Sequence, residues 1–497
     1  MNATTMDWHA KAATLDFTAD LFIDGEFKPS ASGKRFAVTS PIDGRHLADV
    51  AEGDVEDVDR AVKAARAAFE DGRWADRKPA ARKKALMALA DLIDANRAEL
   101  ALTETLDMGK PIGDSFAIDV RATANCFRWY AEAIDKIYDE VAPTGPGDLA
   151  LITREPLGVV GAVVPWNFPM IMAAWKLAPA LAAGNSVILK PAEQSSLTAL
   201  KLATLALEAG IPPGVFNVVT GYGPTAGKAL GLHMDVDGIF FTGSTEVGKL
   251  FLQYAGQSNM KRVGLECGGK SPHVVLASSN RLDAAASAAA DAIFFNQGEV
   301  CTAGSRLIVE RPMVEALVDK IKEKAANYQP GDPLDASTRL GAIVDETQLK
   351  RVLSYVDAAR EDGADVVLGG KQARLDSGGF YVEPTIFGNV TNDMRVAREE
   401  IFGPMLSVIV ANDKDHALSI ANDTIYGLAA AVWTDDLSTA YSFARGLRSG
   451  MVYVNCYDGD DITVPFGGYK QSGIGRDKSL HAFEKYTELK TTWIKLS

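Results

Sequence analysis

The chain has 497 residues, of which 47% are hydrophobic and 23% are charged. A chain of this length exceeds one ordinary hydrophobic core, so we expect two or three compact lobes and exclude a disordered or fibrous protein. Lys and Arg total 51 against 65 Asp and Glu, a net charge of −14 without any basic run, which excludes a nucleic-acid partner bound through phosphates.

The N-terminal residues MNATTMDWHAKAATLDF carry charges where a secretory signal needs a continuous apolar core. We therefore predict no targeting segment and expect a cytoplasmic location. The four cysteines form no CxxC pair, which argues against a disulfide framework or a zinc ribbon and fits a reducing compartment. The six histidines show no HExxH spacing, so we predict no metal site.

The first lobe opens with a hairpin and continues with helices. Asp24 and Gly25 supply the turn of the segment LFIDGEFKPSASGKRFAV. Apolar residues at three- and four-residue spacing, with charges on the opposite face, predict helices over residues 55–70, 80–105 and 118–139. These helices would cover a sheet.

Residues 157–184 are long and apolar enough to imitate a membrane span, with Lys176 as their only charge. Pro165, Pro169 and Pro179 instead predict a buried strand, a tight turn and a helix. We therefore expect no membrane partner.

From residue 157 onwards short Val- and Ile-rich strands alternate with helices, as in VVGAVVP, SVILKP, VFNVVTG and GIFFTG. This rhythm is typical of a doubly wound parallel sheet. It resumes after Lys270 with HVVLAS, an Ala-rich helix from Leu282, RLIVE, a helix over 314–327, ADVVLGG and LSVIVAN, which predicts a second α/β lobe. The tail TELKTTWIKLS reads as a terminal strand, and residues 141–155 could supply a hairpin that pairs with it. Strands left at an edge invite pairing with another chain, so we expect a homo-oligomer.

Two strand, glycine turn and helix units could bind a dinucleotide. GYGPTAG contains Gly223 and Gly227, and FTGSTEVG contains Gly243, although neither unit matches GxGxxG and tight turns alone would explain the glycines. Lys190 and Glu193 follow a predicted strand, where a carboxylate can bind both ribose hydroxyls. Glu193 would repel a 2′-phosphate and so favour NAD over NADP, although a solvated turn is the alternative.

Cys301, in FFNQGEVCTAGSR, is the candidate nucleophile, and Glu266, in GLECGGKSP, is the candidate base. A thiol that attacks a carbonyl and a carboxylate that activates water are the two groups an acyl-enzyme mechanism needs. The small residues around Cys301 predict an exposed turn into a helix whose amides stabilise the thiolate. A buried structural cysteine and a surface glutamate are the alternatives.

The chain resembles the aldehyde dehydrogenase superfamily over nearly its whole length. The resemblance rests on PWNFP, LKPAE, FTGSTEVG, LECGGKSP, FFNQGEVCTAGSR and EEIFGP, in this order. It implies a Rossmann-like α/β cofactor domain, an α/β catalytic domain and a small β flap that forms dimers or tetramers. The expected limits are 1–133 and 157–267 for the NAD domain, 268–473 for the catalytic domain, and 134–156 and 486–497 for the flap.

The resemblance further implies the NAD(P)+-dependent, non-acylating oxidation of a small aldehyde to a carboxylic acid. Cys301 would form a thiohemiacetal and then a thioester, Asn167 would hold the oxyanion, Glu266 would activate water, and Lys176 would support proton movement. The implied cofactor residues are Pro165, Trp166, Lys190, Glu193, Gly223, Gly227, Phe241, Gly243, Ser244, Glu400 and Phe402.

Within the superfamily the C-terminal segment resembles the branch that oxidises γ-glutamyl-γ-aminobutyraldehyde and related aminoaldehydes in putrescine degradation. Asp458, Asp460 and Asp461 lie where this family lines its substrate entrance, and acidic groups there would favour an amino-bearing substrate. A solvated Asp-Gly turn is the alternative. The competing functions are a broad-specificity aliphatic aldehyde dehydrogenase, a coenzyme-A-acylating enzyme and a non-catalytic binding protein.

Two residues depart from the common family pattern. Asp477 stands where many members have Glu, which puts its part in a proton relay in doubt. Cys267 replaces an aliphatic residue next to Glu266, and we hypothesise that it forms an internal disulfide with Cys301 on oxidation.

Overall fold

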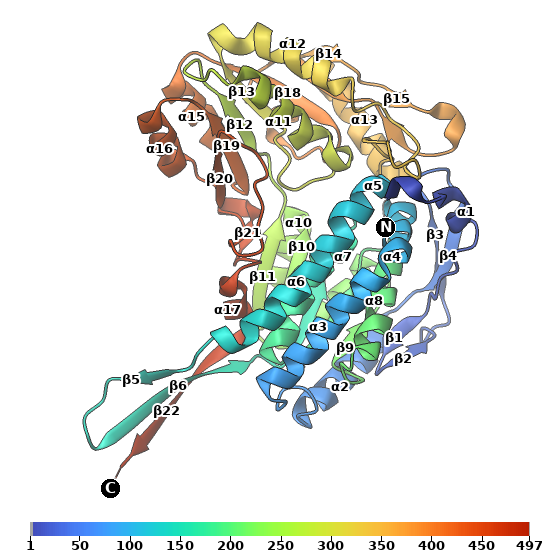
Figure 1. Cartoon of the computed structure of the whole chain (residues 1–497), viewed down its shortest axis with the longest axis vertical. Coiled ribbons are helices and arrows are strands. Elements are labelled where there is room, and N and C mark those ends of the chain that lie inside the picture. Colours follow the sequence, from blue (N-terminus) through green and yellow to red (C-terminus); the bar gives the residue numbers. More distant parts are fainter. Residues whose placement is uncertain (1–2, 497) are drawn as a thin grey trace.

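The computed structural model describes residues 3–496. Two helix-covered sheets form the body, and a narrow three-stranded sheet projects from it and carries the C-terminus (Figure 1). The fold is thus the α/β class with a small β extension that the sequence predicts. The limits of the domains stay a prediction.

The first sheet is parallel at its centre and antiparallel at both edges. Its strands in spatial order are β2 (Glu26–Lys28), β1 (Leu21–Ile23), β9 (Phe216–Val218), β8 (Ser186–Lys190), β7 (Val159–Val163), β10 (Gly238–Gly243), β11 (Arg262–Cys267) and β21 (Gly473–Ile474). Every residue of β7 and β8 is buried, as continuous apolar runs predict for parallel strands covered on both faces.

The strand order reverses at β7. The chain runs from β7 outward through β8 to β9, then returns to the other side of β7 with β10 and β11. In open α/β sheets the ligand crevice lies at such a reversal, outside the carboxyl ends of the strands. The crevice expected here lies between the ends of β7 and β10.

The second sheet is parallel except for one edge strand. Its strands in spatial order are β14 (Asp365–Leu368), β17 (Thr385–Val390), β18 (Met405–Ala411), β13 (Arg306–Glu310), β12 (Pro272–Val275), β19 (Ala429–Trp433) and β20 (Met451–Val454). Two hairpins complete the strands outside the projecting sheet: β3 (Arg35–Thr39) with β4 (His46–Ala51), and β15 (Gln372–Ala373) with β16 (Tyr381–Val382).

The helices fall into two groups that follow the two sheets (Figure 1). The first group is α1 (Trp8–Ala12), α2 (Val55–Glu70), α3 (Pro79–Ala95), α4 (Arg97–Met108), α5 (Ile112–Asp114), α6 (Val120–Ala133), α7 (Pro169–Ala183), α8 (Leu197–Glu208), α9 (Lys228–Leu232) and α10 (Thr245–Gln257). The second is α11 (Leu282–Phe294), α12 (Val314–Ala325), α13 (Glu346–Glu361), α14 (Arg395–Arg398), α15 (Lys414–Asn422) and α16 (Leu437–Gly446), followed by α17 (Phe483–Tyr486) near the C-terminus.

Two predicted helices are shorter than the periodicity indicates. The helix expected over 80–105 is interrupted at Asn96, whose side-chain amide donates to the Leu92 carbonyl at 2.8 Å and so ends α3. The helix expected over 118–139 ends at Ala133 and begins in a π-helical segment, Ser115–Asp119. The predicted helix over 55–70 is confirmed as α2.

The apolar stretch 157–184 folds as predicted, into strand β7, a turn and helix α7. Within residues 3–496, no helix is both long and apolar enough to cross a membrane.

The projecting sheet has the order β22 (Thr487–Lys495), β6 (Asp148–Pro156) and β5 (Glu140–Ala142). β22 pairs with β6 along its entire length, which confirms the predicted partnership of the two edge segments. Leu489 and Trp493 on β22 remain 63% and 62% exposed, so this edge strand presents apolar side chains to solvent.

Candidate active site

The predicted cofactor residues gather at the carboxyl ends of β7, β8 and β10. Pro165 and Trp166 follow β7, and Gly243 and Ser244 stand where β10 gives way to α10. The Ser244 hydroxyl accepts a hydrogen bond from the Val247 amide at 3.3 Å and caps this helix, whose N-terminal end attracts negative charge. The crevice at the strand reversal therefore has the surroundings that a pyrophosphate requires.

Lys190 and Glu193 form an ion pair beside this crevice. The Lys190 ammonium lies 3.3 Å from Glu193 Oε2 and also donates to the Pro191 carbonyl at 3.0 Å. A Cβ added to Gly227 would stand 3.9 Å from the Lys190 side chain, so the glycine turn GYGPTAG lies against the same lysine. A carboxylate held in this way can accept the two hydroxyls of a ribose.

Glu400 and Phe402 lie across from these strands. Glu400 Oε1 accepts the Gly269 amide at 3.0 Å, and burial raises the pKa of this carboxyl to about 7. The rings of Phe402 and Trp166 meet edge to face with centroids 5.1 Å apart. Glu400 and Phe402, two of the implied cofactor residues, thus adjoin the strand ends beside the crevice.

Cys301 lies in a turn that leads into strand β13, and not at the start of a helix as predicted. The three residues Asn296, Gln297 and Gly298 all have positive φ, so the chain coils tightly before Cys301 and leaves no helix whose amides could stabilise a thiolate. Burial, followed by the charges of Glu400, Glu266 and Asp458, raises the pKa of the thiol. The thiol needs a base when it reacts.

Asn167 is held close to this turn. Its side-chain amide donates to the Glu299 carbonyl at 2.7 Å, and Asn296 Nδ2 donates to the Asn167 carbonyl at 3.1 Å. An amide group has two N–H donors, so one remains for an oxyanion.

A buried charge cluster lies beneath Asn167, and the helix patterns did not predict it. The Lys110 ammonium pairs with Asp119, stands 3.9 Å from Glu104 and lies 3.8 Å from the centre of the Phe168 ring. The periodicity had placed the charges of this region on the exposed faces of helices. Tertiary packing of α4 against its neighbours buries Glu104 instead.

Glu266 is the penultimate residue of β11 and is 4% exposed. Neither of its carboxylate oxygens has a hydrogen-bond partner within the described residues. Burial, followed by the charge of Asp477, raises its pKa well above the ordinary range of a glutamate. A carboxylate with these properties is suited to take a proton near neutral pH.

Asp477 lies between two buried lysines. Its Oδ2 is 2.9 Å from the Lys176 ammonium, and its Oδ1 pairs with Lys485. Burial opposes ionisation of this carboxyl, but Lys176 and Lys485 outweigh it, and the pKa of Asp477 falls below its usual value. The shorter carboxylate therefore reaches Lys176. Its second partner, Lys485, is not predicted by any local pattern in the sequence.

The three aspartates of the predicted substrate loop have different surroundings. Asp458 interacts with the side chain of Thr302, the residue after Cys301. Loss of hydration is the largest effect that raises the pKa of the Asp458 carboxyl, and the negative charge of Asp460 raises it further. Asp460 pairs with Lys478, while Asp461 Oδ1 accepts the Thr463 amide at 2.8 Å in a local turn. Of the three charges, that of Asp458 is among the largest contributions that raise the pKa of the Cys301 thiol.

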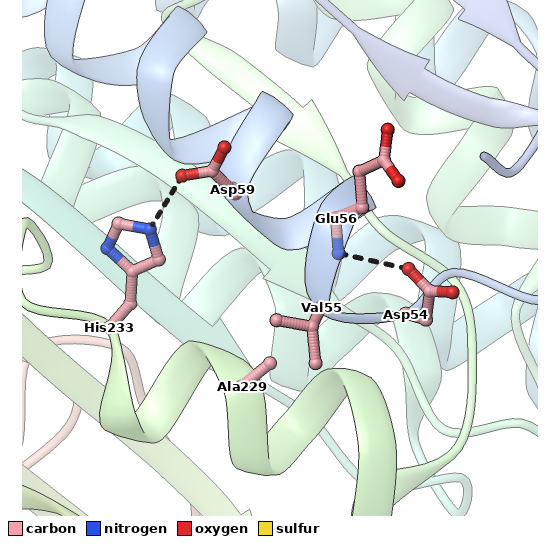
Figure 2. A pocket seen from close by; sticks show the side chains of 6 residues that line it. All are labelled: Asp54, Val55, Glu56, Asp59, Ala229 and His233. Carbon is pink, nitrogen blue, oxygen red and sulfur yellow. Dashed lines mark hydrogen bonds and ion pairs between the residues drawn. The ribbon is translucent and has the colours of Figure 1, made fainter.

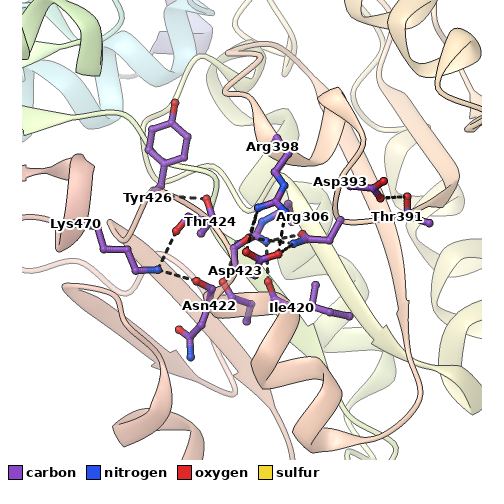
Figure 3. A network of polar contacts seen from close by, with 12 residues as sticks. Arg306, Thr391, Asp393, Arg398, Ile420, Asn422, Asp423, Thr424, Tyr426 and Lys470 are labelled. Atoms are coloured by element: carbon purple, nitrogen blue, oxygen red, sulfur yellow. Dashed lines mark hydrogen bonds and ion pairs between the residues drawn. The ribbon is translucent and has the colours of Figure 1, made fainter.

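Figure 3 shows a network of polar side chains around Arg306 and the end of α15. The guanidinium of Arg306, fully buried, donates to the Lys270 carbonyl at 2.9 Å and to the Ala421 carbonyl at 2.9 Å, near the end of α15. Lys470 donates to the Asn422 carbonyl at 2.8 Å at the same helix end. Cations at a helix C-terminus stabilise its free carbonyls. Because Arg306 also holds the Lys270 carbonyl, the network fixes the segment of Gly268 and Gly269 that follows Glu266 and Cys267.

A separate surface pocket of about 600 Å³ lies between α2 and α9 (Figure 2). It is lined by Asp54, Val55, Glu56, Asp59, Ala229 and His233. None of the predicted site residues lines this pocket, so it does not belong to the candidate active site. In the part of the chain that the structure describes, no group of three or more His, Cys, Asp or Glu side chains could hold a metal ion.

Residues 27–492 match the model of the aldehyde dehydrogenase family. The chain belongs to this family. The predicted superfamily, its fold class and the enzyme class, an NAD(P)+-dependent aldehyde dehydrogenase acting on a small-molecule aldehyde, are thereby confirmed.

Two curated relatives cover almost the whole aldehyde dehydrogenase chain. NADP/NAD-dependent aldehyde dehydrogenase PuuC of Escherichia coli strain K12 is 52% identical, with 98% of each chain covered. Aminoacetaldehyde dehydrogenase of Pseudomonas aeruginosa is 51% identical, with 99% of this chain and 98% of the relative covered.

Solved structures match the entire aldehyde dehydrogenase fold, with 100% of both chains covered in each of three cases. KauB from Pseudomonas aeruginosa is 60% identical with a TM-score of 0.98. A γ-glutamyl-γ-aminobutyraldehyde dehydrogenase from Burkholderia cenocepacia J2315 is 58% identical with a TM-score of 0.97. The indole-3-acetaldehyde dehydrogenase AldA of P. syringae, in complex with NAD+ and IAA, is 57% identical with a TM-score of 0.98.

The position of Cys267 gives no support to a disulfide in this aldehyde dehydrogenase. Successive side chains of a strand point to opposite faces, so Cys267 faces away from Glu266. A Cβ added to Gly248 of α10 would lie 2.8 Å from its sulfur, which shows that the thiol packs against that helix. The bond between Cys267 and Cys301 stays a hypothesis.

Proposed function

We propose that this aldehyde dehydrogenase oxidises amino-bearing aldehydes to carboxylic acids with NAD, and that putrescine-derived aldehydes such as γ-glutamyl-γ-aminobutyraldehyde are its substrates. The observation that carries the proposal is the position of Asp458: its neighbour Tyr457 donates its hydroxyl proton to the carbonyl of Thr302, the residue after Cys301, at 2.5 Å. The Asp458 carboxylate can attract an ammonium group on the aldehyde that Cys301 attacks. The aminoaldehydes in the names of two relatives support the same substrate class.

Cys301 is the proposed nucleophile. The thiol gives its proton to a water molecule as its sulfur adds to the aldehyde carbon, and the oxyanion of the thiohemiacetal is held by the second N–H of the Asn167 amide and by the Cys301 backbone N–H. The Glu299 carbonyl accepts a hydrogen bond from that amide, and Asn296 donates to the backbone carbonyl of Asn167. The loop thus supplies a donor whose orientation is set before substrate arrives.

The crevice at the strand reversal fits NAD. The capped N-terminus of α10 suits the pyrophosphate, and the Glu193 carboxylate suits the adenosine ribose and disfavours a 2′-phosphate. Bound NAD supplies the acceptor for the hydride of the thiohemiacetal. The residues proposed to hold it are Pro165, Trp166, Lys190, Glu193, Gly223, Gly227, Phe241, Gly243, Ser244, Glu400 and Phe402.

Glu266 is the proposed general base. Its raised pKa and its free oxygens allow it to take a proton from the water that hydrolyses the thioester. Asp477 and Lys176 both act on the pKa of Glu266 and contact each other, and we propose that they carry this proton onward. A carboxylate that activates water favours hydrolysis over transfer to coenzyme A.

The projecting sheet is the proposed site of homo-oligomerisation, as a dimer or a tetramer. The exposed apolar side chains of its edge strand β22 support this role. We further propose the domain limits given by the sequence, with residues 1–133 and 157–267 binding NAD, 268–473 carrying catalysis, and 134–156 with 486–497 forming the flap. A cytoplasmic location is part of the same proposal.

The direct test is a substrate panel. kcat/KM is measured with NAD for aldehydes of equal length that end in an ammonium, a carboxylate or a methyl group, without coenzyme A. We expect the ammonium aldehyde to exceed the methyl aldehyde about fivefold, the effect of one partly exposed ion pair of about 1 kcal/mol. Equal values would contradict the amino preference and favour a broad-specificity aliphatic aldehyde dehydrogenase, and a requirement for coenzyme A would contradict hydrolysis.

A further inference from the structure

Lys478 is a buried cation whose partner is exposed. Its side chain is 2% exposed, while the Asp460 side chain with which it pairs is 54% exposed. Asp460 can therefore turn to another partner in solvent, but Lys478 cannot reach water by itself. Leaving a buried ammonium without an anion is strongly unfavourable.

Two aromatic rings enclose the same lysine. Trp175 and Phe466 have ring centroids 4.8 Å apart, and the Lys478 ammonium lies 5.4 Å from the first ring and 6.0 Å from the second. Such rings attract a cation through their faces. The chain's own ammonium already occupies this position, so the ring pair is not free to bind the ammonium of a substrate.

The ion pair belongs to the loop that reaches Cys301. Tyr457 donates its hydroxyl proton to the Thr302 carbonyl at 2.5 Å, and the next residue, Asp458, interacts with the Thr302 side chain. The charge of Asp460 acts on Asp458 in turn. The pair of Asp460 and Lys478 therefore lies one step along the loop from the groups beside the nucleophile.

A ligand that separates Asp460 from Lys478 must replace both charges. An ammonium alone would satisfy Asp460 and leave Lys478 unpaired in its buried position, and a carboxylate alone would satisfy Lys478 and leave Asp460 without a cation. A group with both charges exchanges one ion pair for two and leaves neither residue unpaired. The arrangement thus selects a zwitterion.

We propose that Lys478 and Asp460 bind the far end of the substrate as an α-amino acid group, the carboxylate on Lys478 and the ammonium on Asp460. This inference rests on the proposed function, because it names the part of the aldehyde that lies opposite the group attacked by Cys301. Asp458 remains the group that attracts positive charge nearer the nucleophile. Within the aminoaldehydes, Lys478 and Asp460 then determine specificity for those that end in an amino acid.

The test compares aldehydes of equal length that end in an ammonium, a carboxylate, both charges or neither. kcat/KM for each is measured on wild type, Lys478→Met, Lys478→Arg and Asp460→Asn. Lys322→Met, which removes a lysine paired with Asp319 at 3.2 Å on the surface of α12, is the matched control. Thermal unfolding of each variant shows whether it has kept its fold.

In wild type and Lys322→Met we expect the zwitterionic aldehyde to be preferred over the ammonium aldehyde about tenfold, the factor that corresponds to 1.4 kcal/mol. Lys478→Met should abolish this preference, and Lys478→Arg should retain most of it. Asp460→Asn should instead raise the carboxylate aldehyde relative to the zwitterion. If Lys478→Met does not fold, Asp460→Asn carries the test, because it removes the anion of the same pair, and Lys478→Arg serves as its control.

The inference is overturned if the zwitterionic preference is absent in wild type, or if the Lys478 and Asp460 variants change all four aldehydes by the same factor. Failure of wild type to reduce NAD with any of the four would refute the proposed function itself. The two failures are therefore distinguishable.

Discussion

Asp477 and Lys478 are neighbours in the chain, yet their side chains enter two different charge networks. Asp477 pairs with the buried Lys176 and Lys485 and raises the pKa of Glu266. Lys478 pairs with the exposed Asp460 on the substrate loop. We call the first the inner network and the second the outer network.

The inner network is closed to solvent, and the outer network has one solvent-exposed partner. Charges without water interact more strongly, so the inner network can set the protonation of Glu266. The outer network can exchange partners with a ligand. The residue that acts on the pKa of Glu266, Asp477, and the residue proposed to bind the far end of the substrate, Lys478, are therefore adjacent in the chain.

The largest effect is expected from removal of the proposed nucleophile, Cys301, which both networks serve. Cys301→Ala should lower NADH formation by more than about 10⁴-fold, because no thiohemiacetal can form. Steady-state absorbance at 340 nm measures it. Cys456→Ala, which removes an exposed thiol on the same loop as Asp458, is the control and should retain activity. Substantial turnover by Cys301→Ala would show that another group attacks the aldehyde.

Glu266→Gln should slow hydrolysis of the thioester without slowing its formation. We expect steady-state turnover to fall about 10²- to 10⁴-fold, the usual contribution of a general base, while the first turnover persists as a burst of NADH. Stopped-flow measurement distinguishes the two phases. A burst that slows as much as the steady state would place Glu266 in an earlier step.

Asp477→Asn breaks the inner network while leaving the outer pair in place. Two buried lysines lose their anion, so unfolding in urea should show a loss of about 3 kcal/mol at neutral pH. Because the pKa of Asp477 is lowered in the folded state, this difference should disappear as the pH falls through that pKa. Asp477→Glu keeps the charge and should lose less.

The same Asp477→Asn variant should change the pH dependence of hydrolysis. The charge of Asp477 raises the pKa of Glu266, so its removal should shift the acid limb of kcat to lower pH. An unchanged limb would show that the inner network does not control the base.

The smallest expected effect concerns the outer side of the site. Asp458→Asn should lower kcat/KM for an ammonium aldehyde about fivefold relative to a methyl aldehyde, because one partly exposed charge is removed. Equal losses for the two aldehydes would assign Asp458 a structural role.

The sequence predicts the strands, the helix α2 and the pairing of the two edge segments because each of these leaves a local pattern of apolar residues or turn chemistry. The roles of Cys301, Glu266 and Asn167 are predicted from the resemblance of their sequence motifs to those of a family. The sequence could not predict the ion pairs of Lys485 and Lys478, because tertiary packing brings each lysine to its partner. The polar residues around both lysines also suggest a segment exposed to solvent. The helix expected after Cys301 is wrong because three left-handed residues, fixed by tertiary contacts, turn the chain towards β13.

The central claim is that Cys301 carries a thioester that Glu266 helps to release. Glu266→Gln is mixed with NAD and an ammonium aldehyde, quenched in acid during the burst and weighed by intact mass spectrometry. The account predicts an adduct with the mass of the aldehyde less two hydrogens, located on the peptide of Cys301 and absent from Glu266→Gln combined with Cys301→Ala. Full turnover without this adduct, or an adduct on another residue, would contradict the account.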